Sequence, residues 1–457
     1  MKNLTSLDSR YHNKVKELSE YLSDFSLNKY RTQVEIEWLI FLSELDGFEF
    51  PKTSTGFDVM KARNIVDTFN DQDYQEIKSF EKTTNHDVKA VEYFVSKKLE
   101  MSGITGLEGM THFACTSEDI NNVSYALMCK DSREKILLPA IEELLKMIAD
   151  LTEKCRSYPM LSRTHGQPAS PTTMGKEMYN FYVRLSAQAD QIRNQKIQAK
   201  FNGAVGNFNA HRFAYPDIDW QKATADFINH LGLTNNPATT QIEPHDWLSE
   251  YFHTWMRWNN IALDLCRDTW GYISLGYFRQ ITVKEQTGSS TMPHKINPID
   301  FENAEGNVGL ANALMAHMSD KLQVSRWQRD LSDSTVLRNI GSVFGYVLLS
   351  VKSLCSGLAK IEADTQLMEE ELSNHPEILG EAIQTQLRAI GFPNPYELLK
   401  DFTRGKKITQ ELTNQFIHSL ELDSAVECKL LELRPSDFIG YAAEFPDIRA
   451  KDVSQHV

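Results

Sequence analysis

The stretch DSREKILLPAIEELLKMIADLTEKC, residues 131–155, carries the clearest repeat in the chain. Its apolar residues Leu137, Ile141, Leu144 and Ile148 follow one another at intervals of three or four, which places them on one face of a helix. The stretch is longer than the mean globular helix of about 11–12 residues. The pattern therefore predicts a long amphipathic helix.

Four further stretches repeat this pattern over similar lengths: residues 172–200, 246–280, 299–322 and 334–363. Alternating runs of the kind that strands show are few by comparison. Several long amphipathic helices in series favour an all-α fold built on a long central helical bundle.

The two ends of the chain differ from this middle part. Before residue 112 the helical patterns are shorter and are broken by Gly47 and Pro51, and after residue 364 they are broken by Pro376 and Pro393. A chain of 457 residues is also too long for one ordinary core. We therefore expect an N-terminal helical domain at 1–111, a central long-helix bundle at 112–364 and a C-terminal helical domain at 365–457.

Composition excludes several functional classes. The formal net charge of −14 argues against a general nucleic-acid binder. No uninterrupted apolar run approaches the ~20 residues needed to cross a bilayer, and the N-terminus lacks the apolar core of a signal peptide. The six cysteines form no C-x-x-C pair, which is typical of reduced thiols in the cytoplasm.

The segment GSSTMPHKINP, residues 288–298, is chemically the most informative. Gly288 gives backbone freedom, and Lys295 and Asn297 add a cation and an amide that can hold a carboxylate. Pro298 suits the first position of a following helix. A Gly/Ser loop that ends at a helix start is suited to binding an anion, although composition alone equally allows a flexible polar linker.

This pattern resembles the signature of the fumarase/aspartase/argininosuccinate lyase superfamily. Two further stretches resemble the same superfamily in the expected order, TSEDINN at 116–122 and THGQPA at 164–169. A second set resembles its adenylosuccinate lyase branch, in the longer bacterial form, and the likeness covers nearly the whole chain. This set comprises SRY at 9–11, TTNHDVKAVE at 83–92, TQIEPHD at 240–246, SRWQRDL at 325–331 and STVLR at 334–338.

The resemblance implies an all-α, three-domain fold of the fumarase/aspartase type and a carbon–nitrogen lyase of purine nucleotide biosynthesis. The expected reactions are β-eliminations of fumarate, from adenylosuccinate to give AMP and from SAICAR to give AICAR. No metal or redox cofactor is expected, and no nucleic-acid or membrane partner. The long helices are expected to form the core of a cytoplasmic homotetramer whose active sites are shared between subunits.

The resemblance also assigns the acid–base residues. Ser289 matches the base, His165 the general acid, and Glu302 the carboxylate that orients the histidine. Two alternatives stay open at Ser289: it binds a carboxylate while another group takes the proton, or the adjacent Ser290 is the reactive hydroxyl. Two alternatives without a catalytic role also stay open: His165 as a structural histidine, and Glu302 as a solvent-exposed glutamate on a helix.

Substrate contacts are expected from a larger set of polar and backbone groups. Two positions stay open for His86, a contact to the phosphate and a contact to the leaving group. The residues around it lack the paired ligand spacing of a zinc site. The expected contact residues are Arg10, Tyr11, Asn85, His86, Asp87, Thr116, Ser117, Gln241, Ser290, Lys295, Ile296, Asn297, Asn303, Arg329, Ser334, Thr335, Val336, Leu337 and Arg338.

Two rival functions remain at this level. A sister lyase, acting on argininosuccinate, aspartate or malate, would share residues 288–298 and His165 but not the stretches 83–92 and 325–338. An inactive helical scaffold would not need Ser289, His165, Lys295 and Glu302 together.

Overall fold

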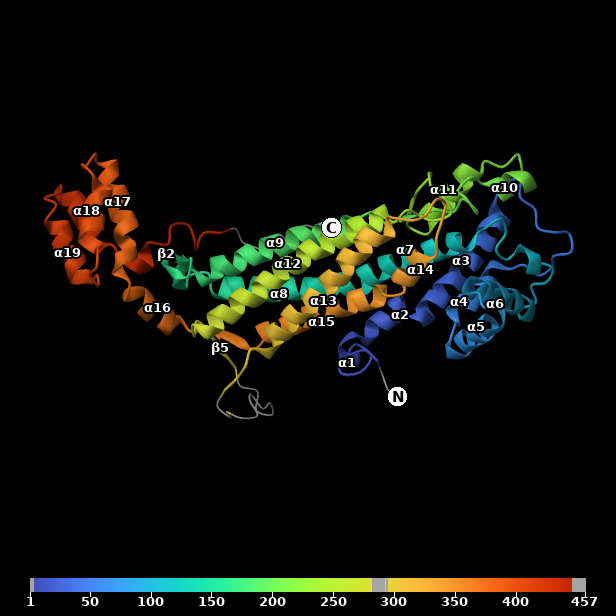
Figure 1. The fold of residues 1–457 in the computed structure, drawn as a ribbon, viewed down its shortest axis with the longest axis horizontal. Coiled ribbons are helices and arrows are strands. Elements are labelled where there is room, and N and C mark those ends of the chain that lie inside the picture. Colours follow the sequence, from blue (N-terminus) through green and yellow to red (C-terminus); the bar gives the residue numbers. More distant parts are fainter. Residues whose placement is uncertain (1–3, 282–291, 293–294, 446–457) are drawn as a thin grey trace. The chain divides into compact units, whose positions relative to one another are not determined.

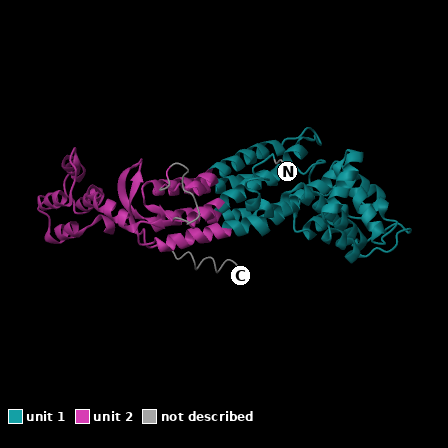
Figure 2. Cartoon of the chain, turned by 90° about the horizontal axis from the view of Figure 1, so that it is seen from below, with its two compact units in different colours: residues 1–141, 188–260, 306–352 teal, residues 142–187, 261–305, 353–457 magenta. Residues whose placement is uncertain are grey.

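The computed structural model describes residues 4–281, 292 and 295–445 (Figure 1). Helices dominate this part of the chain, which confirms the predicted all-α class. The chain divides into two compact units (Figure 2). Unit 1 comprises residues 1–141, 188–260 and 306–352, and unit 2 comprises residues 142–187, 261–305 and 353–457.

In the described part of the chain, five helices, called the long helices below, contribute residues to both units. The predicted helix 299–322 is confirmed with the same bounds. The predicted helix 334–363 is instead divided between the end of α14 (Ser332–Leu337) and the whole of α15. The predicted three-domain division stays a prediction. The long helices are α8 (Leu138–Lys154), α9 (Met174–Asn194), α12 (Asp246–Ser274), α13 (Ile299–Leu322) and α15 (Ile340–Leu358).

Unit 1 is built around α3 (Asp24–Glu44), which packs on α4, α6 and α7. Aromatic side chains fill its interior, with the rings of Trp38 and Phe227 5.0 Å apart. Shorter elements complete the unit: α1 (His12–Val15), α2 (Ser19–Leu22), α4 (Val59–Asp67), α5 (Asp71–Thr84), α6 (Asp87–Met101), α7 (Ser117–Ser132), α10 (Asn209–Ala214), α11 (Trp220–His230) and the parallel strands β3 (Gln198–Ala199) and β4 (Thr234–Asn235).

Unit 2 contains a small helical cluster near the C-terminus with its own apolar core, formed by Leu379, Ile383, Leu387 and Ile417 among others. Two antiparallel strand pairs also lie in this unit. Its elements are β1 (Pro159–Thr164), β2 (Gln167–Thr173), β5 (Phe278–Gln280), β6 (Ile361–Ala363), α16 (Thr365–Ser373), α17 (Gly380–Ala389), α18 (Pro395–Thr403), α19 (Gln410–His418) and α20 (Ser424–Glu432).

One helical stretch, Ser332–Leu358, is long and apolar enough to cross a membrane by length and composition. However, 67% of its most apolar window is buried inside the protein. Such burial is the pattern of a core helix of a globular protein.

Candidate functional site

A buried ion pair fixes the start of α7, where one of the recognised motifs lies. Lys200 Nζ lies 2.8 Å from Asp119 Oδ1, and both side chains are fully buried. The Asp119 carboxylate also accepts hydrogen bonds from the backbone amides of Thr116 and Asn202. Lys200 donates a second hydrogen bond to the Gly203 carbonyl. Because all these polar groups are paired, the motif 116–122 is held rigidly against residues 200–203.

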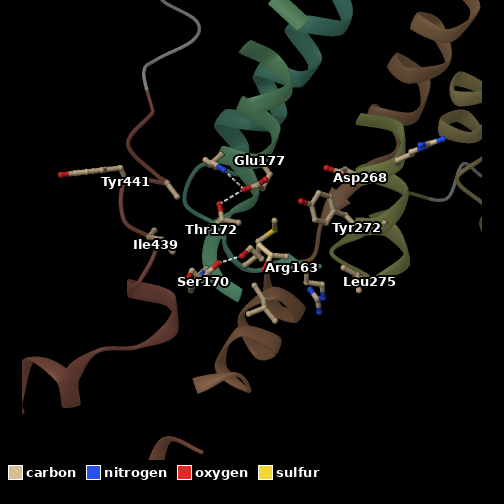
Figure 3. A pocket seen from close by; sticks show the side chains of 18 residues that line it. Arg163, Ser170, Thr172, Glu177, Asp268, Tyr272, Leu275, Ile439 and Tyr441 are labelled. Atoms are coloured by element: carbon tan, nitrogen blue, oxygen red, sulfur yellow. Dashed lines mark hydrogen bonds and ion pairs between the residues drawn. The ribbon is translucent and has the colours of Figure 1, made fainter. Parts of the chain in front are cut away.

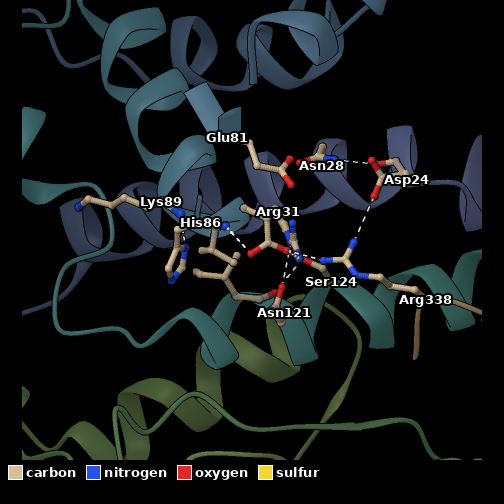
Figure 4. Close-up of polar contacts among 12 residues, drawn as sticks. Asp24, Asn28, Arg31, Glu81, His86, Lys89, Asn121, Ser124 and Arg338 are labelled. Atoms are coloured by element: carbon tan, nitrogen blue, oxygen red, sulfur yellow. Dashed lines mark hydrogen bonds and ion pairs between the residues drawn. The ribbon is translucent and has the colours of Figure 1, made fainter. Parts of the chain in front are cut away.

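A second cluster joins α3, α6, α7 and Arg338 (Figure 4). Asp87 Oδ2 lies 2.8 Å from both Arg31 Nη2 and Arg338 Nη2. Arg31 Nε donates to Asn121 Oδ1 at 2.8 Å, and Arg338 Nη1 reaches Asp24 at 3.4 Å. Burial alone would raise the pKa of Asp87, but Arg31 and then Arg338 outweigh it and lower the pKa to about 2.

This cluster leaves one cation accessible. The Arg31 side chain is 2% exposed, whereas that of Arg338 is 43% exposed. Arg31 therefore pairs with Asp87 in the interior of the protein, and Arg338 presents its guanidinium to solvent. Such an arginine, oriented by a carboxylate, is suited to a bidentate grip on phosphate or carboxylate.

His86 lies beside this cluster and caps α6. Its Nδ1 accepts a hydrogen bond from the Lys89 amide at 3.1 Å, so that the neutral ring carries its proton on Nε2. The exposed side chain can therefore donate from Nε2 to a ligand. Asn85, in a left-handed conformation at the end of α5, is also exposed.

A third cluster in unit 1 gathers Glu118, His245 and Asp333, all of them buried. Each offers one potential ligand atom, and these atoms lie within 4.8 Å of one another. Arg329 Nη2 lies 3.4 Å from Glu118, and Arg329 Nη1 donates to Gln241 Oε1 at 3.1 Å. The structure thus brings together Gln241 and Arg329, two residues from distant motifs that the sequence predicts to contact substrate.

The remaining predicted residues of unit 1 are partly or fully exposed, with one exception. The guanidinium of Arg10 lies over the Tyr11 ring at 5.9 Å, and Thr116 caps α7 just before Ser117. Ser334, Thr335 and Val336 lie on α14. Leu337 is the exception, because the whole residue is only 2% exposed and lies in the core.

His165 lies at the tip of the β1–β2 hairpin in unit 2. Thr164 pairs with Gln167, and the two residues between them have left-handed backbones, with φ of 54° at His165 and 75° at Gly166. Two such residues form the two-residue turn that joins twisted strands most readily. The imidazole is exposed, and in the described part of the chain it has no hydrogen-bond or ion-pair partner.

The signature segment lies partly outside the described residues. Ser289 and Ser290 fall there. Lys295 and Ile296 are exposed just before α13, with Asn297 partly exposed behind them. Glu302 is exposed on α13 and accepts a hydrogen bond from Trp270 Nε1 at 3.2 Å. Asn303, one residue further, accepts from Ser353 Oγ at 2.9 Å. No hydrogen bond between His165 and Glu302 occurs among the described residues, so the predicted orienting pair stays a prediction.

A cavity of about 840 Å³ lies in unit 2 below the hairpin (Figure 3). The hairpin residue Arg163, together with Glu177 on α9 and Asp268 and Tyr272 on α12, contributes to its wall. The charges are of both signs, and the residues that line it include none of those predicted for the site. This cavity is therefore distinct from the predicted substrate contacts.

The sequence analysis missed several polar residues that build the clusters of unit 1: Arg31, Glu118, Asn121, Lys200, His245 and Asp333. One signal for Arg31 was present, because it lies between Leu27 and Val34 on the repeat that buries α3. A charged residue on an apolar face needs a buried partner. Glu118, Asn121 and His245 stood inside recognised motifs, but only the folded chain brings them to their partners.

Two family descriptions match the chain. Residues 10–312 match the lyase family, and residues 325–439 match the adenylosuccinate lyase C-terminal family. Adenylosuccinate lyase from Haemophilus influenzae is 49% identical over 443 residues, 96% of this chain and 97% of that protein. The adenylosuccinate lyase of Escherichia coli is 46% identical over 445 residues, 97% of this chain and 98% of that protein.

Solved structures with low sequence identity share the fold. A fumarate lyase from Mesorhizobium superposes with a TM-score of 0.73 at 18% identity, covering 94% of this chain and 96% of that one. The 3-carboxy-cis,cis-muconate lactonizing enzyme of Pseudomonas putida gives 0.71 at 17% identity, covering 94% of each chain. This likeness supports the fumarase/aspartase-type architecture.

Proposed function

The chain belongs to the adenylosuccinate lyase family, and from this membership we propose how its residues divide the work of a β-elimination. The chain is a carbon–nitrogen lyase that releases fumarate from adenylosuccinate to leave AMP, and from SAICAR to leave AICAR. The elimination needs a base at the carbon beside a carboxylate, an acid at the leaving nitrogen, and cations on the anionic groups.

His165 is the general acid of this proposal, and Ser289 is the base. The observation that carries the assignment is the exposed imidazole of His165 at a tight hairpin tip, with no partner in the described part of its own chain. An imidazole can give up a proton near neutral pH. Ser289 needs a neighbouring cation to stabilise its alkoxide, and Lys295 is the cation of its segment.

The substrate anions are held by the residues of unit 1. Arg338 offers an accessible guanidinium that Asp87 orients, and Arg329 is held beside Gln241. His86 can donate from Nε2 to a phosphate oxygen or to the leaving group. Together these groups provide the cations and donors that a phosphate and two carboxylates need.

The active enzyme is a cytoplasmic homotetramer whose sites draw residues from several subunits. The long helices support this proposal because they expose large apolar side chains: Val183 on α9 is 46% exposed, and Ile299 and Leu310 on α13 are 61% and 51% exposed. Apolar surface of this kind is typical of faces that other chains cover.

A turnover assay tests the reaction. Adenylosuccinate is expected to yield AMP and fumarate, followed by absorbance. Reaction with argininosuccinate, aspartate or malate, but not with adenylosuccinate, would assign the chain to a sister branch instead.

Complementation tests the shared site. Ser289→Ala and His165→Ala are each expected to abolish most turnover while the tetramer survives in sedimentation. When the two variants are mixed, dissociated and reassembled, activity should return because some sites then combine an intact serine with an intact histidine. A verified hybrid tetramer that stays inactive would show that each site comes from one chain.

A further inference from the structure

The buried cluster of Glu118, His245 and Asp333 lies where three substrate-binding stretches meet. Glu118 is in the first turn of α7, directly after Thr116 and Ser117. His245 ends the loop that begins at residue 239, and Asp333 is in the first turn of α14. The exposed fractions of Glu118, His245 and Asp333 are 2%, 3% and 3%. Polar groups at such depth are expensive unless they interact with one another.

If the imidazole of His245 is neutral and carries one proton, some polar atoms of this cluster have no hydrogen-bond partner. His245 Nε2 lies 3.9 Å from Asp333 Oδ2, and its Nδ1 lies 3.8 Å from Glu243 Oε2. Both oxygens of Asp333, Oε1 of Glu118 and Nε2 of His245 have no hydrogen-bond partner within the described chain. An imidazolium has a donor on each ring nitrogen, and small shifts of the ring would serve carboxylates on both sides.

Charge balance favours the same state. Three carboxylates, those of Glu118, Glu243 and Asp333, surround the histidine, and Arg329 is the cation in direct contact with Glu118. Arg329 balances the charge of one carboxylate, and a proton on His245 adds a positive charge that balances a second. A divalent cation at this position would face the guanidinium of Arg329, which already lies 3.4 Å from Glu118. A protonated imidazole is therefore the better occupant.

We propose that His245 is a positioning residue for the elimination, an imidazolium that ties α7, the loop 239–245 and α14 together and so holds Arg329 and Gln241 in place for the substrate. His245 contacts no reacting atom. It acts through Glu118, which pairs with Arg329, and Arg329 in turn donates to Gln241. This inference rests on the proposed function, which gives Arg329 and Gln241 their role.

The electrostatics of the cluster agree with this assignment. Burial alone would lower the pKa of His245, but Asp333, Glu243 and Glu118 outweigh it and raise the pKa above its ordinary value. Burial raises the pKa of Glu118 to about 7, against the pull of Arg329, His245 and the more distant Lys200. The imidazolium is thus favoured below the raised pKa of His245, and it is lost as the pH rises through that pKa.

Two substitutions separate positioning from plain packing. His245→Leu removes both donors at similar volume, and His245→Gln keeps one donor but cannot be charged. If His245 positions ground-state contacts, His245→Leu should raise KM for adenylosuccinate by about tenfold or more, with kcat changed by less than about threefold. His245→Gln should recover only part of the loss, because it keeps one donor but lacks the charge.

The pH profile is the more specific readout. The ratio of KM in His245→Gln to KM in the wild type should exceed 1 below the raised pKa of His245 and fall towards 1 above it, because the wild-type charge disappears there. This ratio also keeps the test valid if His245→Leu does not fold. An unchanged ratio across the pH range would overturn the proposal.

His211→Phe is the matched control. His211 is equally buried in unit 1, but it lies among aromatic rings, and burial lowers its pKa to about 4. Its loss should reduce stability without changing the pH dependence of KM. If His211→Phe and His245→Gln changed the pH dependence of KM in the same way, His245 would be a packing residue and not a positioning residue.

Elemental analysis of the purified tetramer completes the test. No stoichiometric divalent metal that depends on His245 is expected. Such a metal in the wild type, absent from His245→Leu, would overturn the imidazolium assignment. Failure of the wild type to convert adenylosuccinate counts against the proposed function alone, because the effect of His245 is measured only relative to an active wild type.

Discussion

The proposed site residues of unit 1 and those of unit 2 differ in how much support they receive from their own chain. In unit 1, Asp87 and Asp119 each bind at least one buried cation, and the accessible Arg338 is oriented by such a carboxylate. In unit 2, His165 and Lys295 are exposed. The comparison indicates that the proposed anion-binding residues are preorganised by the chain itself, whereas the proposed acid, His165, receives no such support from the described part of the chain.

Breaking the fully buried pair in unit 1 should have the largest effect on stability. Lys200→Met removes the cation from Asp119 and leaves a buried carboxylate without its charge partner. The free energy of unfolding should fall by about 3–5 kcal/mol. Chemical denaturation followed by circular dichroism measures this loss.

Lys135→Met is the control for that prediction. Lys135 also pairs with an aspartate, Asp131, at 2.9 Å, but its side chain is 53% exposed. Its loss should cost no more than about 1 kcal/mol because solvent screens the pair. Equal losses in the two variants would contradict a special role for burial in unit 1.

The cluster at Asp87 should give an intermediate, pH-dependent effect. Asp87→Asn weakens the contacts to Arg31 and Arg338 and should cost about 2 kcal/mol at pH 7, as expected for a pKa lowered to about 2. A lowered pKa contributes stability above the unfolded value of about 4 and loses it as the pH falls from about 4 to about 2. The difference between variant and wild type should therefore shrink between about pH 4 and about pH 2 in urea unfolding.

Asp24→Asn serves as the partner experiment. Asp24 also reaches Arg338, at 3.4 Å, but its side chain is 39% exposed. The loss should stay below about 1 kcal/mol because solvent screens the pair. A larger loss than in Asp87→Asn would mean that Asp24, not Asp87, orients Arg338.

The sequence predicted the helices of the fold better than the contacts of the site. Apolar residues at intervals of three and four mark a helix directly, and the helix at 299–322 was predicted with its observed bounds. The hairpin around His165 was not predicted, because its turn depends on two left-handed residues of which only Gly166 signals such a backbone.

Buried polar partners were beyond prediction for a related reason. The motif 116–122 pointed to Thr116 and Ser117, yet the clusters of unit 1 depend on Glu118, Asp119 and Asn121 in the same motif. Their partners lie far away in the chain, as Lys200 does for Asp119 and Arg31 for Asn121. Spacing along the sequence carries no record of such pairs, and only the packing of α3, α7 and the loops reveals them.

The smallest effect on stability is expected at the proposed acid. His165→Asn removes the imidazole, but asparagine accepts the left-handed backbone of this turn and is the preferred residue before Gly166. The free energy of unfolding should change by less than about 0.5 kcal/mol, since the side chain is exposed and has no partner in the described part of its chain. Turnover should nevertheless fall by about 100-fold or more, as for loss of a general acid. A variant that loses stability and turnover together would show that His165 supports the fold of its own subunit, and the contrast between the two units would then fail.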